Sequence, residues 1–168
     1  MFKVNDYVVY GLMGTYKITD IQQGDPAFSD ESENYYVLHP VYKNNITIKI
    51  PVKKQKELLR PVMSRGEVLS LIASMPEREI IAIESDKQRN DMFKTAKSGN
   101  VEEQIKIIKS LYWKKKNKLA ANKKFAKADE DVMNAVEKQL HEEFAIALNI
   151  TPAEVLPYIL EHIPHDKG

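Results

Sequence analysis

The hydrophobic pattern of this chain changes its period once, and this change constrains the fold more than any other feature. Up to Ile50, apolar residues recur at every second position, which is typical of β-strands. From Ser64 onward they recur at every third or fourth position, which is typical of helices. The sequence therefore predicts an α+β chain with a β-module at residues 1–55, a linker at 56–63 and an all-helical bundle at 64–168.

The β-module is expected to contain four or five short strands. The apolar and β-branched runs that predict them are residues 7–10, 15–21, 35–38 and 46–50. The polar stretch 22–33 indicates a loop, and Asn44-Asn45 indicates a tight turn. In the last run, Ile46, Ile48 and Ile50 fall on one face of a strand, and Thr47 and Lys49 fall on the other. Strands this short, with little helix among them, favour a small, strongly bent sheet or an open barrel.

The helical module is expected to form a bundle of about five helices. Their predicted positions are 64–75, 77–97, from 101, 128–148 and from 151, with capping signals at Ser64, Asn100 and Thr151. Two apolar stripes have helical spacing: Val101, Ile105, Ile108 and Tyr112, and Val132, Val136, Leu140 and Phe144. Trp113 falls well off the first stripe.

The sequence contains no recognisable active site. It has neither a glycine-rich phosphate loop nor a GxSxG motif. His141-Glu142-Glu143 lacks the second histidine of a metalloprotease motif, because Ala145 stands there. His162 and His165 have a ligand-like spacing, but Pro164 interrupts it, and a polar tail is the expected explanation. We expect a non-enzyme with no cofactor and no metal.

Charge is distributed unevenly along the chain, although the net charge is only +1. Residues 104–127 contain nine lysines and no acid, whereas residues 128–166 contain nine acids and one lysine. Two solvated helix faces would explain this pattern; a local basic patch that needs a second contact to hold DNA would explain it too. The absence of cysteine, of a long apolar run and of a secretion signal favours the cytoplasm.

Four segments of the chain resemble the CarD (CdnL) family of bacterial transcription regulators. They are the opening Met1–Tyr10 with Gly14, the strand Ile46–Pro51, the segment Leu59–Ser64 with Glu67-Val68, and Leu140–Ile150. The resemblance implies a Tudor-like N-terminal domain that binds the β subunit of RNA polymerase, a domain type also found in transcription-repair coupling factors. It also implies a helical domain that contacts the upstream edge of the promoter bubble and stabilises the open complex.

The resemblance also implies site residues. Lys49 matches a basic family position at the polymerase surface, with Thr47 on the same outward face; the alternative is an ordinary exposed strand lysine. Typical members carry a wedge tryptophan before the second helix of the C-terminal domain. The nearest residue here is Ser85, and the segment 84–89 holds no aromatic residue.

A basic helix face is the candidate for DNA contact. Lys106, Lys109, Trp113 and Lys116 share one face by helical spacing, and Lys87 and Arg89 precede them on another segment. The alternative is that Trp113 packs against the neighbouring module. We therefore expect a regulator that binds polymerase, touches promoter DNA weakly and modulates open-complex stability. The alternative is a polymerase-binding or Tudor-like adaptor whose helical domain binds protein. Activation or repression, target promoters and oligomeric state stay open.

Overall fold

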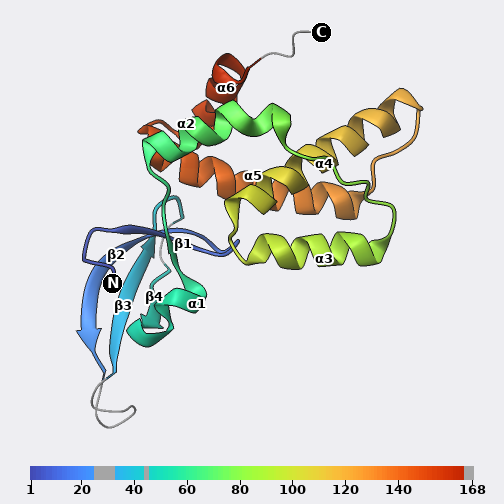
Figure 1. Ribbon diagram of the computed structural model, residues 1–168. Helices are drawn as coiled ribbons and strands as arrows, with labels where there is room; N and C mark the ends of the chain where they lie inside the picture. Colours follow the sequence, from blue (N-terminus) through green and yellow to red (C-terminus); the bar gives the residue numbers. More distant parts are fainter. Residues whose placement is uncertain (25–32, 44–45, 165–168) are drawn as a thin grey trace. The chain divides into compact units, whose positions relative to one another are not determined.

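The computed structural model describes residues 1–24, 33–43 and 46–164 (Figure 1). The chain divides into two compact units, Met1–Val62 and Met63–Gly168, named here the sheet unit and the helical unit. This confirms the predicted α+β class. The expected turn at Asn44-Asn45, His165 and most of the expected loop at 22–33 lie outside the described residues.

The sheet unit is a five-stranded antiparallel sheet in the order β4-β3-β2-β1-β5. The strands are β1 Tyr7–Tyr10, β2 Gly14–Gln23, β3 Asn34–Pro40, β4 Ile48–Pro51 and β5 Arg60–Pro61. A short 3-10 helix, η1 Val52–Lys54, and the helix α1 Gln55–Leu58 connect β4 to β5. The turn between β1 and β2 depends on glycine, because Gly11 and Gly14 have φ angles of 50° and 143°.

One face of this sheet forms the core of the unit. Seven buried side chains pack there: Val8, Tyr16, Ile18, Tyr36, Leu38, Ile50 and Leu59. They come from β1, β2, β3, β4 and the segment before β5, so every strand except the two-residue β5 contributes. Burial of each large apolar side chain contributes about 1.5–3 kcal/mol. The Tyr36 hydroxyl adds a polar link, since it accepts from the Phe2 amide at 3.1 Å and donates to Gln55 Oε1 at 2.8 Å.

The expected linker at 56–63 is mostly part of the sheet unit. β5 pairs with β1 through Val8↔Pro61 and Val9↔Arg60, and Leu59 is buried in the core. The first unit therefore ends at Val62 rather than at residue 55. A two-residue strand is too short to show alternation, and Pro61 favours a linker on sequence grounds, which is why the pattern placed the boundary too early.

Strand β4 is shorter than its sequence predicts. Ile50 is buried and Ile48 packs against the core, but Ile46 is 53% exposed and precedes the strand. The register Leu38↔Ile48 would place Ile46 opposite Pro40, the last residue of β3. Proline has no N–H to donate, so the ladder ends before this pair.

The helical unit contains the five expected helices. They are α2 Arg65–Ser74, α3 Asp86–Lys97, α4 Val101–Ala120, α5 Lys127–Leu148 and α6 Pro152–His162, with a 3-10 turn, η2 Met75–Glu77, after α2. The predicted stripe Val132, Val136, Leu140 and Phe144 is buried along α5, which contacts all the other helices of the unit. Ser64 and Asn100 cap α2 and α4 by accepting from Glu67 N and Glu103 N.

Two details of the predicted helices are wrong. The helix expected at 77–97 begins only at Asp86, because residues 78–84 run outside any helix and a capping box of Ser85 and Gln88 starts α3. On α4 the buried face includes Gln104, Ile107 and Leu111, while Tyr112 is 43% exposed. Of the predicted stripe, Val101 and Ile105 are buried and Ile108 is partly buried, so the prediction is wrong at Tyr112.

Candidate functional site

The sheet has a second face, opposite the core, that carries aromatic and basic side chains. Tyr7, Lys17 and His39 are paired across β1, β2 and β3, so they form one row on this face. The Lys17 ammonium lies 5.8 Å from the centre of the Tyr7 ring, within reach of a cation–π contact. We name these three residues, with Lys49, the outer face of the sheet.

Lys49 joins this face through the next row. It pairs with Val37 on β3, which in turn pairs with Asp20 on β2. A register shift between Ile18 and Asp20, a β-bulge, places Asp20 rather than Thr19 opposite Val37. Lys49 is exposed on β4, an edge strand of the sheet, as the alternation of its sequence predicts. Thr47 is exposed as well, but it precedes the paired part of the strand.

Two of the six residues predicted for DNA contact also make contacts within the helical unit. Lys109 Nζ donates to the carbonyl oxygens of Met75, Pro76 and Arg78 at 3.2, 2.7 and 2.7 Å, which uses all three of its N–H groups. Arg89 bonds to Asp86 and Asp129. Lys109 cannot bind a phosphate without breaking these contacts, and two of the five N–H groups of Arg89 are already used.

The other four predicted residues are more accessible. Trp113, 46% exposed, and the exposed Lys116 lie on α4. The exposed Lys87 lies on α3. Lys106 lies 3.4 Å from Glu79, a surface pair that salt weakens. The structure therefore keeps Trp113 and Lys116 on one face of α4 and places Lys87 on a separate helix.

Trp113 borders a hollow near the end of α4. The hollow has a volume of about 230 Å³ and is lined by Trp113, Lys114, Asn117, Lys118, Ala121 and Lys123. An aromatic ring beside lysines is a surface on which a base can stack while ammonium groups contact phosphates. Lys118 and Lys123 belong to the lysine-rich stretch but were not predicted to contact DNA. Lys118 is five residues from Trp113, off the i, i+3 and i+4 spacing, and Lys123 follows the helix.

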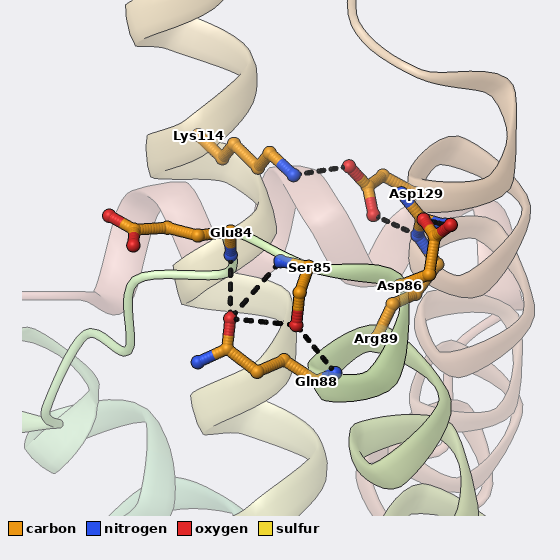
Figure 2. Close-up of polar contacts among 7 residues, drawn as sticks. All are labelled: Glu84, Ser85, Asp86, Gln88, Arg89, Lys114 and Asp129. Carbon is orange, nitrogen blue, oxygen red and sulfur yellow. Dashed lines mark hydrogen bonds and ion pairs between the residues drawn. The ribbon is translucent and has the colours of Figure 1, made fainter.

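A buried carboxylate connects three helices of the helical unit (Figure 2). Asp129 of α5 is fully buried and accepts from Arg89 Nε of α3 at 2.5 Å and from Lys114 Nζ of α4 at 2.7 Å. Burial alone would raise the pKa of Asp129, but the hydrogen bonds from Arg89 and Lys114 outweigh burial and hold this pKa below its usual value. The same pairing raises the pKa of Arg89.

Ser85, the residue nearest to the family's wedge position, has a structural role at the start of α3 (Figure 2). Its hydroxyl accepts from the Gln88 amide at 3.2 Å, while Gln88 Oε1 accepts from the amides of Glu84 and Ser85 at 2.8 and 3.2 Å. Arg89 and Asp129 anchor the same turn. The start of α3 is thus fixed by polar contacts.

Asp129 and Lys114 were not among the residues selected from the sequence. An acid in the first turn of a helix is common, because it complements the helix dipole. Nothing in the sequence distinguishes Asp129 from Glu130 and Asp131, which are exposed. The row of Tyr7, Lys17 and His39 was missed for a different reason, since its register depends on strand pairing across the whole sheet.

Within residues 1–24, 33–43 and 46–164, no three His, Asp or Glu side chains gather as metal ligands would. No single helix in these ranges has the length and apolar content to span a membrane; α5 and α6 together have that length and apolar content, with an 81° bend between them.

The N-terminal part of the chain is similar to a known family of domains. Residues 2–63 match the family model described as CarD-like/TRCF RID domain, a family of RNA polymerase-interacting domains without enzymatic activity. No curated protein matches the chain. The matched range coincides with the sheet unit to within one residue at each end.

Asn5, in the opening segment of the chain, has a left-handed backbone conformation with a φ angle of 78°. Asparagine tolerates this left-handed region better than most residues. The Asn5 amide also donates to the Ile18 carbonyl at 2.7 Å, which ties the opening segment to β2.

Proposed function

Because residues 2–63 form a CarD-like RNA polymerase-interacting domain, we propose that this chain is a transcription regulator that binds the β subunit of RNA polymerase. The contact is made through the outer face of the sheet, with Lys49 and Thr47 at its edge. The observation that carries the proposal is the coincidence of the matched range with one compact unit that exposes Lys49 on an edge strand. Such a regulator acts in the bacterial cytoplasm.

The chemistry of the outer face fits an acidic partner surface. Lys17, Lys49 and Tyr7 present two ammonium groups and a phenol, and an exposed edge strand can add main-chain hydrogen bonds to a partner strand. Long-range attraction between lysines and carboxylates speeds association more than it tightens the complex. Binding is therefore expected to weaken as salt rises.

Charge reversal at Lys49 tests this proposal in the full chain. Lys49→Glu should weaken binding to purified polymerase by about tenfold or more, measured by biolayer interferometry, because a repelling charge replaces an attracting one. Lys56→Glu is the matched control, since Lys56 is exposed on α1, away from the outer face. Equal affinity of Lys49→Glu and the wild type, with both proteins folded, would remove Lys49 from the interface.

We further propose that the helical unit touches promoter DNA while polymerase holds the protein in place. The exposed Trp113 with Lys116, Lys118 and Lys123 supports this second step. A few lysine–phosphate contacts bind weakly, but tethering raises the effective DNA concentration to roughly millimolar. A preference of about 1–2 kcal/mol for the melted promoter would shift the open-complex equilibrium by roughly five- to thirty-fold.

The DNA step has its own test. Trp113→Ala should shorten the lifetime of the open complex formed with polymerase, whereas Leu119→Ala, another exposed apolar residue of α4, should leave it unchanged. Lys116, Lys118 and Lys123 changed together to alanine should act like Trp113→Ala. If both variants fold, bind polymerase and leave the lifetime unaltered, the helical unit acts as a protein-binding adaptor instead.

A further inference from the structure

Helix α6 buries little of its apolar surface. Val155 is its one buried residue, although the helix is rich in large apolar side chains. Leu156, Ile159, Leu160 and Ile163 recur at the spacing i, i+3, i+4, i+7 and form one stripe along the helix and its C-cap. Leu160 is 60% exposed. A continuous apolar stripe of this kind on a water-facing helix marks a surface that another molecule covers.

A groove of about 420 Å³ runs beside this stripe, within the helical unit. Its walls come from η2, α4, α5 and α6, and the apolar part of its floor includes Ile105, Ile108, Leu140 and Phe144. Leu156, Ile159 and Ile163 of the stripe line it, while Leu160 extends the apolar surface beyond it. An apolar surface longer than the cavity suits a helix, which places several side chains along a groove, better than a small molecule enclosed in one pocket.

The groove has one acidic corner. Tyr112 donates to Glu137 Oε2 at 2.6 Å, and burial together with Glu137 raises the pKa of Tyr112 to about 12, so the phenol stays a donor. The other oxygen, Oε1, lies 3.9 Å from His141 Nε2, too far for a hydrogen bond. Burial lowers the pKa of His141, so its ring is neutral near pH 7. The Glu137 charge therefore keeps the capacity to pair with a cation from outside.

Lys109 is the cation that lines the groove, and it does not neutralise this corner. Its three N–H groups are used by the carbonyls of Met75, Pro76 and Arg78. Glu137 is the acid that lines the groove, so it is the charge that the groove offers to a ligand. A second copy that docked through the same groove would bring a second Glu137 to the contact, so charge favours a basic partner over self-association.

We propose that this groove binds an amphipathic helix of another protein, with apolar residues at i, i+3, i+4 and i+7 and a flanking lysine or arginine that pairs with Glu137. The inference is independent of the polymerase and DNA contacts, which involve other surfaces. The partner helix covers the apolar stripe of α6, and its basic side chain lies beside the Tyr112–Glu137 pair.

The test uses the full chain and a fluorescein-labelled synthetic helix of about 15 residues. The peptide carries leucines at i, i+3, i+4 and i+7 with lysines beside them; one matched peptide replaces the lysines by glutamates, and another scrambles the leucine positions. Fluorescence anisotropy should show saturable binding of the lysine peptide, with the glutamate peptide at least about tenfold weaker. The scrambled peptide should bind no more tightly than the glutamate peptide.

Protein variants locate the site. Leu160→Asp, at an exposed position, should weaken binding of the lysine peptide by about tenfold or more, because it places a charge in the apolar contact. Glu137→Gln should remove most of the preference for lysine over glutamate flanks. Leu119→Asp, exposed on α4 outside the groove, is the control and should bind normally.

Three outcomes would overturn the proposal. The first is absence of saturable binding by the lysine peptide. The second is equal binding of the lysine, glutamate and scrambled peptides to the wild type. The third is a wild-type dimer in sedimentation experiments that Leu160→Asp dissociates, since the groove would then belong to a second copy of the chain.

Discussion

The two units of this protein are stabilised by different kinds of buried contact. Among the described residues, the buried side chains of the sheet unit are apolar apart from Thr15 and the hydroxyls of Tyr16 and Tyr36, and none is a carboxylate. The helical unit buries Gln104, Ser110, Asp129, Gln139, Glu142 and Glu143. A hydrophobic core tolerates changes of pH, whereas a buried carboxylate stabilises only while it is ionised and paired. The units should therefore respond differently to the same perturbation.

Truncation of the sheet unit should have the largest effect on stability. It also tests where this unit ends. A fragment of residues 1–62 should melt cooperatively, whereas a fragment of residues 1–55 should not fold, because it lacks β5 and the buried Leu59. Loss of one buried leucine costs about 2–5 kcal/mol, which matches the whole stability of about 3–5 kcal/mol expected for so small a core. Circular dichroism of both fragments checks this. Identical melts would show that the segment 56–62 is dispensable.

Removal of the buried charge of Asp129 should have the second largest effect on stability. Asp129→Asn should destabilise the helical unit by about 3 kcal/mol, because Arg89 and Lys114 lose the carboxylate that compensates them. Asp131→Asn, at an exposed position two residues away, should change stability by no more than about 0.5 kcal/mol. Urea unfolding of both variants gives the comparison. A small effect at Asp129 would mean that the unit depends on apolar packing, as the sheet unit does.

Acid should destabilise the helical unit more than the sheet unit. The folded pKa of Asp129 lies below its unfolded value of about 3.9, so its stabilisation is complete above that pH and is lost as the pH falls through the folded pKa. His141 acts with the same sign from about pH 6.5 downward, since burial lowers its folded pKa and the unfolded chain binds the proton first.

The measurement is urea unfolding of the fragments 1–62 and 63–168 at a series of pH values. The helical fragment should lose stability more steeply below pH 7, and Asp129→Asn should flatten its dependence at the acid end. In the sheet fragment, Lys53 and Tyr35 lower the pKa of Glu33 at the surface, where solvent limits the effect. A sheet fragment as acid-sensitive as the helical one would contradict the comparison.

The smallest effect concerns the polar link of the sheet core. Tyr36→Phe should cost about 1–2 kcal/mol, because the Phe2 amide and Gln55 lose a hydrogen-bond partner. Tyr7→Phe is the control, with an expected change within about 0.5 kcal/mol, since Tyr7 lies on the outer face. Thermal melts of the fragment 1–62 suffice. If Tyr36→Phe costs more stability than Asp129→Asn, the sheet unit depends on its buried polar contacts more than the helical unit does.

The sequence predicted the elements that depend on local pattern. The apolar stripe of α5, the caps at Ser64 and Asn100, and the exposed Lys49 all follow from residue spacing, and all are present. Spacing within one element sets these features, so no knowledge of the other elements is needed.

The features that depend on distant residues could not be predicted in this way. β5 is recognisable only by its pairing with β1, and the burial of Asp129 requires Arg89 and Lys114 from two other helices. Lys109 looked like a phosphate ligand because its three carbonyl acceptors lie more than thirty positions earlier in the chain. In each of these cases the contact joins residues that are far apart in the sequence, so the pattern of one segment does not show it.

The contact between Met63 and Glu143 has a consequence for the order of synthesis. The amide of Met63, the first residue of the helical unit, donates to the buried carboxylate of Glu143 at 2.9 Å, 80 positions later. At about 5–20 residues per second, the ribosome needs about 4–16 s to supply that acceptor. The sheet unit has every strand by Val62 and can fold during this interval. The sheet unit can therefore be folded before the acceptor of the Met63 amide has been synthesised.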